Sequence, residues 1–165
     1  MTIQYLTLLR DNPKLSQDSS PNRPLTLQEI EQLEQLWNNG QPFPIVLREY
    51  LFLAGNYNWT FEMEEPLELR ASYEYHRNFA NFTMPPRPFF VVGQDVTGGG
   101  SQFWIVFLDE GAPDPKIYNL NLYENVMMEI HDMERIEDPN LTLSEFINGG
   151  IRSFRELQRR GYHKY

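Results

Sequence analysis

The tetrad Thr-Leu-x-Glu occurs twice in this chain, once toward each end, and each copy marks the start of a helix. Thr26-Leu-Gln-Glu29 and Thr142-Leu-Ser-Glu145 are both capping boxes. In such a box the threonine hydroxyl accepts a hydrogen bond from the glutamate N–H, and the glutamate carboxylate reaches back to the threonine N–H. Each box is flanked by two apolar residues at the spacing of a hydrophobic staple, Leu25 with Ile30 and Leu141 with Phe146. The tetrads therefore predict one helix on each side of the central part of the chain.

Hydrophobic spacing predicts two further helices in the first half. The helix that starts at Thr26 carries an apolar face and stops at Asn38-Asn39-Gly40. Another begins at Pro44, which suits a first helical position, and ends at Gly55. A third is predicted over residues 67–82. In the last helix, Gly149-Gly150 is predicted to break or kink the chain before a second segment.

Three short apolar runs lie between these helices and predict strands. They cover residues 88–93, 102–108 and 116–120, and clusters of glycine, proline and aspartate separate them. Strands joined by short turns form an antiparallel meander. Residues 56–61 are a weaker strand candidate, and residues 123–138 have no clear pattern. The prediction is an α+β fold, with an antiparallel β-meander sheet packed against an N-terminal helix pair and a C-terminal helix.

Length and composition indicate one domain. A chain of 165 residues, of which 41% are hydrophobic and none is cysteine, can bury a core without disulfides. Residues 1–24 are rich in turn formers and are predicted to be an N-terminal arm, in which residues 3–9 dock as a short strand or helix. Residues 25–165 are predicted to be the domain, with a basic C-terminal helix. We find neither a signal peptide pattern nor an apolar run of membrane length, and expect a cytoplasmic protein.

The order of these elements resembles the SUKH superfamily over roughly residues 25–150. The resemblance begins with the capped helix, the turn Gly40-Gln-Pro-Phe-Pro44 and the second helix. It continues with the strand that ends at Asp95, the glycine-rich turn at 98–100, the aromatic strand 102–108 and Lys116-Ile-Tyr118. The capped helix at 142–147 closes it. The chain departs from many members in its long, tyrosine-rich stretch 57–85 and in Asn119-Leu-Asn121.

The resemblance implies that the protein binds a partner rather than catalysing a reaction. SUKH members look like non-enzymatic binding modules, and many bacterial ones are immunity proteins that bind and neutralise polymorphic toxins, often nucleases. Fungal relatives act as interaction proteins in cell-wall signalling. We therefore expect an immunity protein, with an intracellular scaffold or regulatory interaction protein as the alternative. An unrecognised hydrolase is the second alternative.

Charge points to the chemistry of the partner. The net charge is −9, which repels nucleic acid and anionic membranes and attracts a basic protein surface. Acids concentrate in residues 109–138, interleaved with tyrosine and methionine, whereas cations collect after residue 151. The oligomeric state is left open by these patterns. We predict that the following residues contact a protein partner: Asp95, Asp109, Glu110, Asp114, Tyr118, Tyr123, Glu124 and Asp132.

No motif in the sequence predicts catalysis or a cofactor. Gly98-Gly99-Gly100-Ser101 lacks the lysine of a phosphate-binding loop and is interpreted as a hairpin turn. His131-Asp132 with Glu129 and Glu134 could gather around a metal, but no known metal-binding spacing is present, and a solvated surface is the preferred interpretation. No serine stands in a nucleophile motif. We expect no catalytic residue, no metal and no cofactor.

Overall fold

A computed structural model describes residues 1–14, 20–58, 65–80, 83–95, 102–122, 124, 126–129 and 141–160. Five helices lie within these residues: α1 (Thr7–Asp11), α2 (Leu27–Trp37), α3 (Ile45–Ala54), α4 (Pro66–Ala80) and α5 (Leu143–Arg159). The strands are β1 (Phe89–Asp95), β2 (Gln102–Phe107), β3 (Tyr118–Asn121) and β4 (Val126–Glu129). The predicted α+β class is confirmed. The fourth strand falls in a stretch for which the sequence made no prediction.

The strands form one antiparallel sheet in the order β1-β2-β3-β4. The register pairs Phe89 with Phe107 and Ile105 with Tyr118, and it shifts once, between Val91 and Gly93. Consecutive strands are neighbours, so the sheet is the meander that the turn clusters predict. The glycine-rich turn between β1 and β2 lies outside the described residues.

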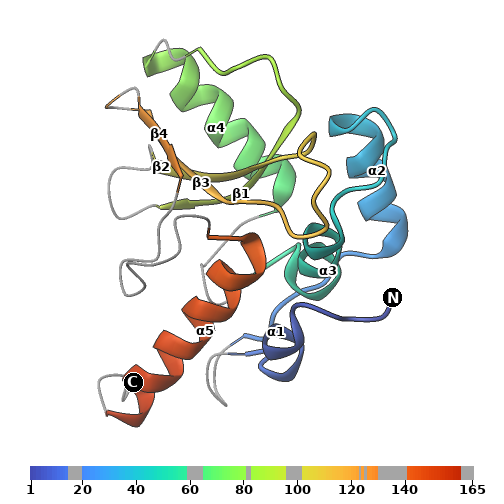
Figure 1. Ribbon diagram of the computed structural model, residues 1–165, viewed down its shortest axis with the longest axis vertical. Helices are drawn as coiled ribbons and strands as arrows, with labels where there is room; N and C mark the ends of the chain where they lie inside the picture. The colour runs from blue at the N-terminus through green and yellow to red at the C-terminus, as the bar shows by residue number, and fades with distance from the viewer. Residues whose placement is uncertain are drawn as a thin grey trace.

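Helices cover both faces of this sheet (Figure 1). Side chains alternate between the faces along a strand. Phe103, Ile105 and Phe107 of β2 therefore pack in one core cluster with Tyr73 of α4, whereas Val106 packs in the other cluster with α2, α3 and α5. Two-sided burial explains why β2 is an unbroken apolar run rather than an alternating one. The sequence predicted the helices on one face but not the position of α4 on the other.

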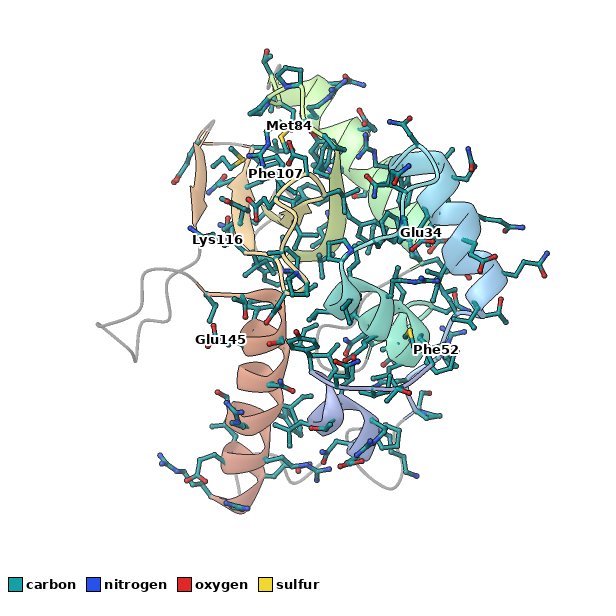
Figure 2. All side chains as sticks on the ribbon, turned by 45° about the vertical axis from the view of Figure 1, so that its right-hand side comes forward. Glu34, Phe52, Met84, Phe107, Lys116 and Glu145 are labelled. Carbon is teal, nitrogen blue, oxygen red and sulfur yellow. The ribbon has the colours of Figure 1, made fainter. Side chains whose placement is uncertain are left out.

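The two capping boxes form as predicted. The Glu29 N–H donates to the Thr26 hydroxyl at 3.2 Å, and the Thr26 N–H donates to the Glu29 carboxylate at 2.7 Å. The same exchange joins Thr142 and Glu145 at the start of α5, where Figure 2 labels Glu145. Each box satisfies N–H groups that the first turn of a helix leaves without partners. These local contacts explain why both helix starts could be predicted.

The predicted break at Gly149-Gly150 is wrong, because α5 continues through both glycines. Ile147 and Ile151 lie on either side of them on the buried face and are at most 1% exposed. A glycine costs a helix about 1 kcal/mol relative to alanine, whereas burial of each isoleucine contributes about 1.5–3 kcal/mol. Packing therefore outweighs local propensity here.

The N-terminal residues dock on the domain. A short helix or strand was expected within residues 3–9, and the structure has the helix α1, which begins only at Thr7 and runs to Asp11. Leu6 and Leu9 are at most 1% exposed and belong to the main core cluster. Glu49 of α3 is fully buried, and its carboxylate accepts three backbone N–H groups, from Gln4 at 2.6 Å, Tyr5 at 3.0 Å and Leu6 at 2.9 Å. The first residues are thus tied to the centre of the molecule.

Candidate functional site

The turn between β2 and β3 carries three of the predicted partner-binding acids. Gly111 adopts a left-handed backbone with φ of 69°, and prolines at 113 and 115 limit the turn further. The Pro113 carbonyl accepts a hydrogen bond from the Val46 N–H at the start of α3, at 3.0 Å. The turn is therefore held against the helix pair, and it presents Asp109 and Glu110 at its beginning.

Asp109 is clamped by Arg87, a residue that the sequence did not single out. The guanidinium Nη2 lies 2.6 Å from Oδ1, and Nε lies 2.9 Å from Oδ2, so both carboxylate oxygens are engaged. The guanidinium also lies over the ring of Phe107, 3.9 Å from its centroid. The hydrogen bond from Arg87 lowers the pKa of Asp109, so this carboxylate stays charged at a lower pH than an ordinary aspartate does.

Glu110 and Tyr118 extend the same network. The Tyr118 hydroxyl donates to the Glu110 carboxylate at 2.8 Å, and Arg87 lies 3.7 Å from that carboxylate. The Tyr118 ring meets the Phe107 ring edge to face at 5.0 Å. We call these five residues the Arg87 network: Arg87, Phe107, Asp109, Glu110 and Tyr118. Its charged groups are one-fifth to two-fifths exposed, and the network lies on the sheet face that α4 covers.

Asp114 has a different position and a structural contact. Its carboxylate accepts hydrogen bonds from the N–H of Ser144 at 3.0 Å and from the Ser144 hydroxyl at 2.6 Å. Ser144 lies in the first turn of α5, where a negative charge stabilises the helix. Asp114 thus fastens α5 to the β2–β3 turn and does not share the Arg87 network.

The structure places the other predicted residues apart from this network or does not describe them. Glu124 is exposed just after β3, and its N–H donates to the Asn121 side chain at 3.3 Å. Asp95 ends β1 opposite Gln102, but its side chain is outside the described part of the chain. Tyr123 and Asp132 also lie outside the described residues, as does the candidate metal residue His131. Three of the eight predicted residues are therefore brought together.

The Arg87 network was only partly predictable. Asp109, Glu110 and Tyr118 stand out in the sequence as acids beside an aromatic residue. Arg87 lies in Pro85-Pro-Arg-Pro88, which has no periodic pattern. It meets Asp109 because Phe89 pairs with Phe107, which brings the residues before β1 beside those after β2. The contact between Arg87 and Asp109 therefore depends on the strand register, which the sequence does not show.

The network is suited to recognition, since it combines fixed acids at a solvent-exposed turn with an arginine and the half-buried Tyr118 beside them. In the described ranges no group of three histidine, cysteine or acidic side chains is placed to hold a metal ion. His76 faces Phe103 with ring centroids 5.8 Å apart, and its Nδ1 lies 2.9 Å from the Ser72 carbonyl oxygen. None of the helices in the described residues is both long and apolar enough to cross a membrane.

Comparison with family models, with curated proteins and with solved structures found no match to this chain.

Proposed function

We propose that this protein is a non-enzymatic binding module of the SUKH superfamily and that it acts as a bacterial immunity protein. It would bind a polymorphic toxin domain that presents a basic surface, such as that of a nuclease, and block it sterically in the cytoplasm. The observation that carries the proposal is the Arg87 network. It displays two acids beside the half-buried Tyr118 at an exposed turn, with the buried Phe107 behind them, and its side chains are already held by one another.

A preformed network favours binding because less side-chain freedom is lost when the partner arrives. Arg87 engages the two oxygens of Asp109, and Tyr118 holds Glu110. A lysine or arginine of the partner could still approach the carboxylates from the solvent side. The net charge of −9 would speed the encounter with a basic protein. The order of the elements supports the family proposal.

The test uses the toxin domain encoded beside the gene. The purified full chain, added in excess, should bind this domain and abolish its activity. Asp109→Lys should weaken the complex by about tenfold or more and reduce its dependence on salt. Glu31→Lys makes the same change of charge at an exposed position on α2 and serves as the matched control. If the toxin stays active in the presence of excess protein, the proposal is wrong.

A further inference from the structure

The outer face of α4 carries an apolar stripe that nothing in the described structure covers. Leu67 is 57% exposed and Tyr75 is 69% exposed, the largest exposed fraction among the large hydrophobic side chains described. Ala71 is exposed between them. These residues follow one another at intervals of four, so they lie on one side of the helix. The opposite side buries Leu69 and Tyr73 against the sheet.

Tyr75, the aromatic residue of the stripe, has an aromatic neighbour. The ring of Tyr75 meets the ring of His76 edge to face, with centroids 5.2 Å apart. His76 is itself fixed, because it packs against Phe103 of β2 and its Nδ1 lies 2.9 Å from the Ser72 carbonyl oxygen. A tyrosine braced in this way loses little freedom on binding, and tyrosine is among the residues that dominate binding energy at interfaces.

Two acids beside the stripe have no cation within ion-pair distance among the described residues. Glu65 and Glu68 are exposed at the start of α4, and neither has an ion pair with a described residue. Glu74 differs, because Arg70 and Arg77 lie 2.9 Å and 3.2 Å from its carboxylate. Arg70 is further held over the ring of Phe89. The cations of α4 are thus occupied within the helix and the sheet, whereas Glu68 and Glu65, the residue directly before the helix, remain available.

We propose that the outer face of α4 is the apolar part of the partner interface. Its occupant is a protein whose contact face has an apolar recess, which receives Tyr75 and Leu67, and a rim of lysine or arginine that meets Glu65 and Glu68. This inference rests on the proposed function for the kind of partner. It adds a surface on the same side of the sheet as the Arg87 network. The Arg87 network offers mainly charged groups to a partner, and α4 adds exposed apolar side chains to them.

The first experiment titrates full-length variants with the purified toxin domain encoded beside the gene. Leu67→Ala together with Tyr75→Ala should weaken binding by about tenfold or more. Glu65→Gln together with Glu68→Gln should slow association and reduce its salt dependence. Leu36→Ala is the matched control, because Leu36 is 61% exposed on a different helix, α2. Its affinity should equal that of the unaltered chain.

The outcomes separate this inference from the proposed function. If the toxin is neutralised and the α4 variants bind as tightly as the unaltered chain, the inference is overturned and the proposed function stands. If the toxin does not bind, the proposed function fails. The α4 face is then probed in source cells, with the photo-crosslinking residue p-benzoylphenylalanine in place of Tyr75 or, as control, of Leu36.

A protein that cross-links at position 75 alone is identified, purified and titrated against the same variants. Loss of binding with the Leu67 and Tyr75 substitutions, but not with Leu36→Ala, supports the inference without an immunity role. A purified protein whose binding is insensitive to those substitutions, or the lack of any cross-link specific to position 75, overturns it. Thermal unfolding of each variant shows whether it is folded. The substituted side chains are exposed, so we expect only small changes in stability.

Discussion

At the scale of single residues, buried carboxylates hold this fold together in places that hydrophobic patterns do not reveal. Glu49 is fully buried and accepts three backbone N–H groups of the N-terminal segment. Glu34 is 5% exposed, accepts the N–H of Phe43 at 2.7 Å and lies 3.3 Å from Arg48. Figure 2 shows Glu34 between α2 and α3. A buried acid without such partners would be strongly destabilising. The two carboxylates therefore require the backbone segments that donate these hydrogen bonds to lie beside them.

Glu49→Gln should therefore lower the free energy of unfolding by about 2 kcal/mol or more. The amide keeps the shape of the side chain but replaces one acceptor oxygen with a donor group, which faces a backbone N–H. Glu31→Gln makes the same change on the exposed side of α2 and should alter stability by less than about 0.5 kcal/mol. Urea unfolding measures both values. Equal midpoints for the two variants would contradict the role assigned to Glu49.

At the scale of elements, helix starts follow local rules and helix interiors follow the tertiary environment. Both capping boxes form as their residues predict. Gly149, by contrast, lies inside α5, and a Cβ built there meets no atom within 4 Å apart from its chain neighbours and the adjacent backbone of its own helix. Gly55 ends α3 with φ of −70°, a value that any residue can adopt. Glycine is required there because the position has no room for a side chain. A Cβ at Gly55 would lie 2.6 Å from the Leu51 carbonyl oxygen and 2.9 Å from Leu25 Cγ.

Replacement by alanine should have opposite effects on stability at the two glycines. Gly149→Ala should raise the free energy of unfolding by about 0.5–1 kcal/mol, because alanine restricts the unfolded chain and favours helix. Gly55→Ala should lower it, since the new methyl group meets backbone atoms that cannot move cheaply. Thermal unfolding of the two variants beside the unaltered chain gives both signs. A loss of stability in Gly149→Ala would mean that α5 is strained at its glycines.

At the scale of the whole molecule, one sheet joins two cores. Tyr50 of α3 lies in the main core, and its hydroxyl donates to the Val92 carbonyl oxygen of β1 at 3.5 Å. Tyr73 of α4 occupies the other core, with its ring 5.3 Å from Phe89 and 5.7 Å from Phe103. Burial raises the pKa of both tyrosines, because the charged phenolate would lose its hydration. Stability on both sides of the sheet thus depends on neutral phenols.

The raised pKa of Tyr50 predicts how stability falls in alkali. The unfolded phenol ionises near pH 10, while the buried one stays protonated above that pH. The stabilisation is therefore complete below about pH 10 and is lost as the pH rises toward the folded pKa, by up to about 1.4 kcal/mol per pH unit. Tyr50→Phe should make this decline shallower in urea unfolding between about pH 9 and about pH 11. Tyr75→Phe, which removes an exposed hydroxyl, is the control, and an equal slope in the two variants would refute the assignment.

The sequence alone determined the two capped helix starts, the first three strands of the meander and the α+β class, because capping, turn formation and short apolar runs depend on residues close together in the chain. It also gave Asp109, Glu110 and Tyr118 as candidate contact residues, but without separating them from the five other candidates. Only the tertiary structure decided that α4 covers the second face of the sheet and that α5 passes through Gly149-Gly150. It likewise brought Arg87 to Asp109 and the N-terminal segment to Glu49. These contacts join residues 22 to 45 positions apart, and the register and packing that create them have no local signal in the sequence.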